Sequence, residues 1–291
     1  EDVEDWYKND RSDNTYHNKI IVFRSGDYTV KGSPDDNGNI RLDAGSKTPS
    51  LIAYPGESPV LDCATAKVFT DDGSLKDVFV AGMTWKDGRQ DVNNAHFWWA
   101  IGDVSRATWW KNTWYNLGPG QVGDDNTTPV FVSSTDGMKD NILYKENVHD
   151  RINTVGSNGS YLDMYFCQYV LIEQNIAKNS NTNYGWWVKR ADNFVTIRAN
   201  VAAENVEGNQ ITVGYSGPVP HDNEVSWNFI RANVSNNNSS LLWAGSASNE
   251  GATYNSFIYR NTFVGGSAWV RFPGINPYQV DGNVVMSDLL A

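Results

Sequence analysis

The sequence predicts an all-β fold, a right-handed parallel β-helix of about eight coils, from a long-period repeat and from strand-like alternation inside each unit. An Asn closes each of six short β-rich segments, and the intervals between these residues are 28, 25, 28, 33 and 22 residues. The segments end at Asn147, Asn175, Asn200, Asn228, Asn261 and Asn283. A period of this length, with mixed strand and turn content, is typical of a solenoid in which each repeat forms one coil.

Two adjacent positions of the repeat differ consistently in polarity. The third residue before each Asn is apolar: Tyr144, Ile172, Ile197, Val225, Ile258 and Val280. The next residue is mostly polar: Lys145, Glu173, Arg198, Ser226, Tyr259 and Asp281. Because adjacent residues of a strand point to opposite faces, the first column is expected to line the core. Helical repeats are disfavoured by the β-branched residues and by Asn and Gly, and a propeller would need blades of about 40 to 50 residues.

The recurrent Asn itself has a structural explanation. Coils stacked about 4.8 Å apart would bring successive Asn side chains within hydrogen-bonding distance, as in a ladder. A second strand is expected in each coil, at 131–133, 164–166, 187–189, 212–214, 242–244 and 270–272. We expect residues 1–291 to form a single domain, in which the polar segment 1–30 caps the open end of the first coil.

Composition limits the partners and the location. The net charge of −11 argues against nucleic acid, which requires a basic surface. No run approaches the roughly 18 apolar residues of a membrane span. The chain begins with Glu1, as a secreted chain does after its signal peptide is removed, so an extracellular protein is expected. Cys63 and Cys167 could form one disulfide or remain as two buried thiols.

The opening coils resemble a known family. Ser25-Gly26-Asp27-Tyr28 precedes Ala53-Tyr54-Pro55-Gly56-Glu57-Ser58-Pro59-Val60, and 78–85 match the next coil. These segments resemble the pectate-lyase-like superfamily of parallel β-helices, and most closely the polysaccharide lyase family of chondroitinase B and certain alginate lyases. The resemblance implies a catalytic Lys on an outward strand position, an Arg one coil later and a calcium ion held by Asn and Glu.

Only part of that catalytic set is present. Trp187-Val188-Lys189 matches the Lys segment, whereas no Arg occurs near Val213-Gly214-Tyr215 and no Glu-x-Glu element precedes Lys189. Cleavage of a uronate by β-elimination requires a base for the C5 proton and cations for the enolate. We expect Lys189 and Arg190 to supply these, and Tyr215 or His221, about one coil later, to supply the acid.

Other residues are candidates for binding. Glu146, Asp150 and Asp163 could hold calcium, which prefers oxygen ligands. Outward aromatic rings could stack on sugars, and the remaining substrate-binding candidates are Trp186, Trp187, Trp243 and Arg271.

The sequence thus favours a secreted lyase that acts on an anionic polysaccharide. A non-catalytic glycan-binding adhesin or self-associating fibre subunit is the first alternative, and a glycoside hydrolase on the same scaffold is the second. Solvated turn acids and core aromatics remain the simpler interpretations of the metal and sugar candidates.

Overall fold

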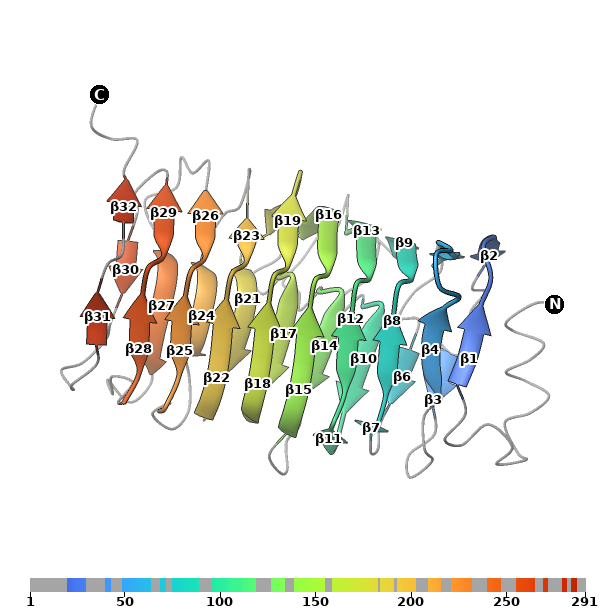
Figure 1. Ribbon diagram of the computed structural model, residues 1–291, viewed down its shortest axis with the longest axis horizontal. Helices are drawn as coiled ribbons and strands as arrows, with labels where there is room; N and C mark the ends of the chain where they lie inside the picture. Colours follow the sequence, from blue (N-terminus) through green and yellow to red (C-terminus); the bar gives the residue numbers. More distant parts are fainter. Residues whose placement is uncertain are drawn as a thin grey trace.

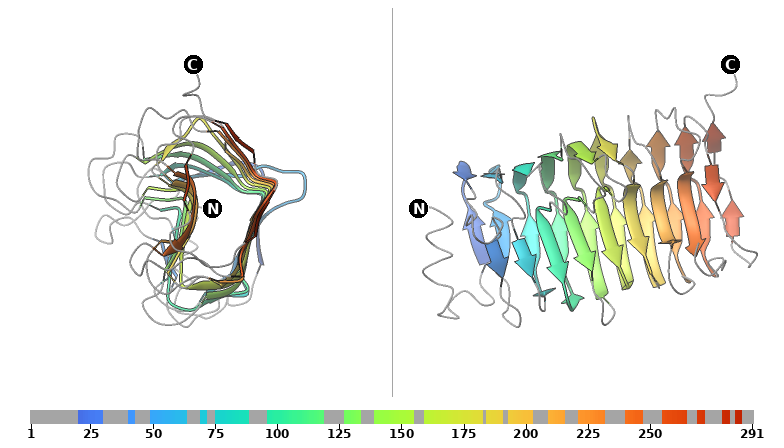
Figure 2. Two further views of the ribbon diagram at one scale, coloured as in Figure 1. Left: turned by 90° about the vertical axis from the view of Figure 1, so that its left-hand side faces the viewer. Right: turned by 180° about the vertical axis from the view of Figure 1, so that it is seen from behind.

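The computed structural model is built from β-strands that pair in parallel from one coil to the next (Figure 1). It describes residues 20–29, 40–42, 49–63, 69–71, 75–88, 96–118, 127–133, 139–154, 159–182, 184–190, 193–202, 209–215, 221–231, 240–246, 255–264, 269–271, 279–281 and 284–286. Each coil passes through three sheets in the order A, B and C, which enclose the core (Figure 2).

The strands are distributed over the sheets as follows. Sheet A contains β1 (Ile20–Phe23), β4 (Ser50–Ala53), β8 (Phe79–Ala81), β12 (Thr108–Trp110), β15 (Lys139–Lys145), β18 (Cys167–Glu173), β22 (Asn193–Arg198), β25 (Glu224–Ser226), β28 (Phe257–Tyr259) and β31 (Gln279–Asp281), with β7 (Leu75–Lys76) and β11 (Val104–Ser105) beside them. Sheet B contains β2 (Asp27–Thr29), β5 (Val60–Asp62), β9 (Thr84–Gly88), β13 (Thr113–Leu117), β16 (Val148–Thr154), β19 (Ile176–Lys178), β23 (Val201–Ala202), β26 (Phe229–Arg231), β29 (Thr262–Val264) and β32 (Val284–Met286), and β20 (Asn181–Thr182) pairs with β16. Sheet C contains β3 (Ile40–Leu42), β6 (Phe69–Asp71), β10 (Trp98–Ile101), β14 (Val130–Ser133), β17 (Leu162–Tyr165), β21 (Tyr184–Lys189), β24 (Asn209–Tyr215), β27 (Ser240–Ser246) and β30 (Trp269–Arg271).

The apolar column read from the sequence forms one continuous file in sheet A. Strand pairing places its members in register from Tyr144 through Ile172, Ile197, Val225 and Ile258 to Val280. The first five of these side chains are buried. The predicted right-handed parallel β-helix is therefore confirmed, with nine strands in sheet C against the predicted total of about eight coils.

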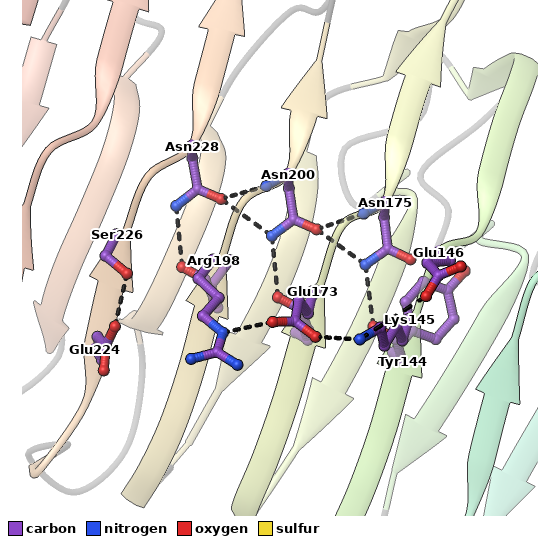
Figure 3. Close-up of polar contacts among 12 residues, drawn as sticks. Tyr144, Lys145, Glu146, Glu173, Asn175, Arg198, Asn200, Glu224, Ser226 and Asn228 are labelled. Carbon is purple, nitrogen blue, oxygen red and sulfur yellow. Dashed lines mark hydrogen bonds and ion pairs between the residues drawn. The ribbon is translucent and has the colours of Figure 1, made fainter.

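The Asn ladder predicted from the repeat is present at the corner between sheets A and B (Figure 3). The side-chain oxygen of Asn175 accepts hydrogen bonds from the backbone and side-chain nitrogens of Asn147, at 2.9 and 3.1 Å. Asn175 and Asn200 repeat the pattern at 2.9 Å for both bonds. The ladder extends over Asn112, Asn147, Asn175, Asn200, Asn228 and Asn261, all of which are buried. These bonds satisfy backbone groups that the turn removes from the strand ladders.

Two expectations concerned the ends and the cysteines. Of the segment 1–30 predicted to cap the helix, residues 20–29 form β1 and β2, the first strands of sheets A and B, and 1–19 lie outside the described residues. Cys63 and Cys167 are both buried free thiols, so the disulfide alternative does not apply. No helix able to cross a bilayer occurs among the described residues.

Candidate functional site

The side chains of sheet C that point away from the core form one file along the molecule. In β17, Leu162 and Met164 belong to the core, so Asp163 between them points to the other face. The same alternation in β21 turns Trp187 outward. Strand register continues this file through Trp99, Phe131, Asp163, Trp187 and Thr212.

The middle of this outward file is buried, unlike much of the outer surface. Asp163 is 0% exposed, and Trp187 and Thr212 are also buried. Outward residues of the other two sheets, such as Phe257 in sheet A and Ile176 in sheet B, are exposed. A carboxyl group shielded from water on the outside of a β-helix is costly unless other groups compensate it. This burial marks the Asp163 region as the candidate site.

Lys189 is the residue that compensates Asp163. Only 6% of Lys189 is exposed, and its Nζ atom lies 3.8 Å from Oδ2 of Asp163, as an ion pair longer than a hydrogen bond. The same nitrogen lies 3.2 Å from the ring centroid of Trp187 and 4.2 Å from that of Tyr165. Two aromatic faces therefore supply cation–π stabilisation to a lysine that has lost most of its water.

Burial sets the electrostatics of this cluster. Removal from water raises the pKa of Asp163 from 3.8 to about 7, against the opposing influence of Lys189, Tyr165 and Arg190. Neither carboxyl oxygen of Asp163 accepts a hydrogen bond from the described residues. Burial also raises the pKa of Tyr165, so its hydroxyl stays protonated at neutral pH. The cluster thus holds a carboxyl group that can exchange a proton near neutral pH.

An exposed cation and a pair of stacked rings border the cluster. Arg190 follows β21 in a left-handed conformation, with φ of 72°, and its guanidinium carbon lies 5.0 Å from the Tyr165 ring centroid. The Tyr184 and Trp187 rings stack with centroids 3.7 Å apart. We name Asp163, Tyr165, Trp187, Lys189 and Arg190 the sheet C cluster. It combines proton-transfer groups with an exposed cation suited to an anion.

Four of the residues singled out from the sequence therefore lie together, namely Asp163, Trp187, Lys189 and Arg190. Trp186 does not join them, because its ring is fully buried in the core. Its predicted role in stacking on a sugar is wrong: alternation turns one ring of the doublet inward, and that ring is Trp186.

Three further candidates are placed by their backbone. Tyr215 ends β24, directly after Gly214, which pairs with Lys189. Trp243 in β27 pairs with Thr212, and Arg271 in β30 pairs with Trp243. Their side chains lie outside the described part, so their roles remain predictions.

His221 lies apart from the contacts of the sheet C cluster. It forms an isolated parallel bridge with Asn193, at the start of the sheet A part of its coil. Its Nδ1 atom is 2.6 Å from Oδ2 of Asp222, and its ring meets that of Phe194 edge-on at 5.9 Å. These contacts give His221 a local partner at that corner, and its predicted role as the acid receives no support from them.

The three carboxylates predicted to bind calcium do not form one site. Glu146 follows β15 of sheet A, Asp150 lies in β16 of sheet B, and Asp163 lies in β17 of sheet C. Each is paired with a different lysine: Lys111 and Lys145 for Glu146, Lys178 for Asp150 and Lys189 for Asp163. No group of three acids, histidines or cysteines suited to a metal occurs among the described residues. The residues present do not fit the predicted ion, and no chemical step is derived through it.

Sequence reasoning missed Tyr165 and considered Asp163 only as a calcium ligand. Both lie opposite members of the Trp187-Val188-Lys189 segment, since Asp163 pairs with Trp187 and Tyr165 with Lys189. The second strands expected at 164–166 and 187–189 differ by one residue from the observed register, in which Asp163 and not Met164 pairs with Trp187.

Sheet A presents a second outward polar file that differs in character (Figure 3). Glu173 bridges Lys145 and Arg198, each at 2.7 Å, and all three side chains reach solvent to some extent. Because water screens such pairs, this file is a surface ion-pair ladder, and the shielded groups belong to sheet C.

The three-sheet topology makes the chain a right-handed parallel β-helix. It matches no protein-family model, and no curated protein matches its sequence. Among solved structures it is similar to PfbA, a surface adhesin of Streptococcus pneumoniae, with 11% identity, a TM-score of 0.42 and coverage of 98% of this chain and 87% of that one. It is also similar to pectate lyase Pel9A, with 13% identity, a TM-score of 0.49 and coverage of 96% and 71%. At these identities the similarities concern the fold alone.

Proposed function

We propose that the protein is an extracellular polysaccharide lyase that cleaves a uronate-containing glycan by β-elimination at the sheet C cluster. The observation that carries the proposal is the buried Asp163–Lys189 pair on an outward face, with the exposed Arg190 beside it. A buried ion pair is weak evidence for stability, because desolvation of the two charges offsets their attraction. A role in proton transfer gives such a pair a reason to occupy this position.

The cluster has a group for each requirement of the reaction. In the proposed mechanism Lys189, as the neutral amine, takes the C5 proton while the C4–O4 bond breaks and a C4–C5 double bond forms. Tyr165 donates its hydroxyl proton to the departing O4, and Lys189 then returns a proton to Tyr165. Arg190 holds the substrate carboxylate and stabilises the enolate that develops there.

Asp163 acts in this scheme through Lys189. In the resting pair the aromatic faces stabilise the ammonium form of Lys189. Its proton passes to Asp163 when a bound substrate removes the remaining water, because low-dielectric surroundings favour the neutral forms of both groups. Because burial raises the pKa of Asp163 to about 7, its carboxyl group can hold the resting proton of Lys189 near neutral pH. Asp163 is therefore a positioning and proton-holding residue, and Lys189 is the base.

The non-catalytic alternative also has a specific observation in its favour. Ile176, Val201 and Phe229 form an exposed apolar file in register on sheet B. Such a surface suits self-association or adhesion. It lies on a different sheet from the cluster, so the two functions are separable by experiment.

The test is to incubate the protein with a panel of uronate glycans, namely polygalacturonate, alginate and chondroitin sulfate, with neutral dextran as the control. A lyase yields products whose new double bond absorbs in the ultraviolet, with one new reducing end for each such bond. New reducing ends without that absorbance would replace the proposal with a hydrolase. Binding without cleavage of any glycan would replace it with the adhesin.

A further inference from the structure

The residue before each ladder Asn occupies the corner between sheets A and B. Six of these corner residues have φ between 53° and 57°: Lys111, Glu146, Gln174, Ala199, Trp227 and Arg260. Five of the six are charged, polar or small, as expected for a solvated turn. Trp227 is the exception, because 55% of this large apolar residue is exposed.

The two faces of the Trp227 ring meet different neighbours. The guanidinium carbon of Arg260, from the following coil, lies 4.7 Å from the ring centroid and covers one face. The other face is turned towards the preceding coil, where the corner residue is Ala199. Alanine is the smallest residue of the column, so this face of the indole has no bulky side chain of the column against it.

The next corner residue in that direction is Gln174, two coils from Trp227. Coils stack about 4.8 Å apart, so the backbones at Gln174 and Trp227 are separated by roughly 10 Å across Ala199. Stacked rings approach to about 4.5 Å or more. The corner therefore forms a slot about one sugar ring thick, with Ala199 as its floor.

The charges beside the slot are positive. Arg198 precedes Ala199 and carries a partly exposed side chain, whose Nε donates to Oε1 of Glu173 at 2.7 Å (Figure 3). Lys145 is paired with the other oxygen of Glu173 and also with Glu146, which Lys111 holds too, so this row of three cations and two carboxylates carries one net positive charge. Arg260 adds a further cation behind the indole ring.

We propose that the slot formed by Gln174, Ala199 and Trp227 binds one ring of an acidic oligosaccharide, whose carboxylate lies towards Arg198. The apolar face of the sugar stacks on the open face of the indole, and hydroxyl groups meet Gln174. This site lies at the corner between sheets A and B, apart from the sheet C cluster, and does not require that the protein cleave glycans. It gives a long acidic chain a second point of attachment.

The column itself provides a matched pair of variants. Ala199→Gln fills the slot with a side chain that the backbone already accepts, because Gln174 has φ of 57° and Ala199 has φ of 53°. Ala199→Gly leaves the slot open and suits a left-handed conformation. The two variants should unfold at similar temperatures, so a difference in binding between them reports on the slot.

The readout is the indole N–H resonance of Trp227, assigned by its disappearance in Trp227→Phe. We expect it to shift saturably on titration with hexagalacturonate and much less with maltohexaose. Ala199→Gln should weaken this binding about three- to tenfold, as loss of one stacking contact would, and Ala199→Gly should leave it unchanged. Lys189→Met should retain the shift, which separates this site from the proposed lyase function.

An unshifted Trp227 resonance in the wild-type protein would overturn the proposal. Equal affinity of the Ala199→Gln and Ala199→Gly variants would overturn it too, because the slot would then contribute nothing. Loss of the shift in Lys189→Met would show that the resonance responds to occupation of the sheet C cluster.

Discussion

Replacing Asn175 with alanine would remove the centre of the Asn ladder. The side-chain oxygen of Asn175 accepts two hydrogen bonds from Asn147, and its amide nitrogen donates to the Tyr144 carbonyl at 3.0 Å and to Oδ1 of Asn200 at 2.9 Å. Oδ1 of Asn200 would keep the backbone N–H of residue 175 as a donor. Two donors of Asn147 and the carbonyl of Tyr144 would lose their partners.

The expected loss of stability follows from these three orphaned groups. Each buried polar group without a partner costs about 1–3 kcal/mol, and water entering the vacated space recovers part of this. We expect Asn175→Ala to lower the free energy of unfolding by about 3–6 kcal/mol, a large share of the 5–15 kcal/mol typical of a folded protein. Asn179→Ala is the control, since that exposed side chain makes one bond, to Asp150 at 3.0 Å. With the left-handed φ of 49° at this position, the change should cost about 2 kcal/mol.

Urea unfolding followed by tryptophan fluorescence measures both variants. The account predicts a clearly lower midpoint for Asn175→Ala than for Asn179→Ala. Equal midpoints would refute the reasoning, because the buried ladder would then contribute no more than a surface amide.

Three further outcomes are expected. Burial lowers the pKa of His149 from 6.5 to about 3, so between these pH values the unfolded chain binds one proton more than the folded chain. The free energy of unfolding should therefore rise from pH 3 to pH 6.5. Urea unfolding at several pH values should show a smaller rise for His149→Phe than for wild type. Asp163 has the opposite effect, because the folded state keeps its proton between pH 3.8 and about 7. The free energy of unfolding of wild type should therefore fall relative to that of Asp163→Asn as the pH rises through this range. A difference between the two proteins that does not change with pH would contradict the burial argument. Glu173→Gln should cost about 1 kcal/mol at low salt and less at high salt, because its ion pairs with Lys145 and Arg198 are partly solvated; a loss that does not depend on salt would contradict this.

The sequence was sufficient to predict those features of the fold that recur in every coil. The alternation around Tyr144 and Ile172 and the recurrence of Asn175 and Asn200 each reflect one short-range rule acting in every coil. Sheet B was not anticipated, because its strands are short: Ile176–Lys178 has one buried side chain, Ala177, and offers too few residues for alternation to be visible.

The candidate site could be predicted from the sequence only in part. Lys189 was found from the resemblance of its segment to the lyase family, and Arg190 from its charge beside Lys189. Two aspects were not accessible: the burial of the outward file around Asp163, and the phase that turns Trp186 inward. Both depend on contacts between segments distant in sequence. The carboxylates proposed to bind calcium lie apart for a related reason, since Glu146 and Asp163 are close in sequence but the coil carries them to different sheets.

The central claim is that shielded groups on sheet C, and not the solvated ion pairs of sheet A, act on the glycan. It is tested most directly by comparing Lys189→Gln with Lys145→Gln on the uronate glycan that wild type cleaves, since both residues are ion-paired lysines on outward positions. The account predicts that Lys189→Gln loses at least about 100-fold in kcat and that Lys145→Gln stays near the wild-type rate, with both variants folded by circular dichroism. Equal rates for the two variants, or a loss confined to Lys145→Gln, would contradict it.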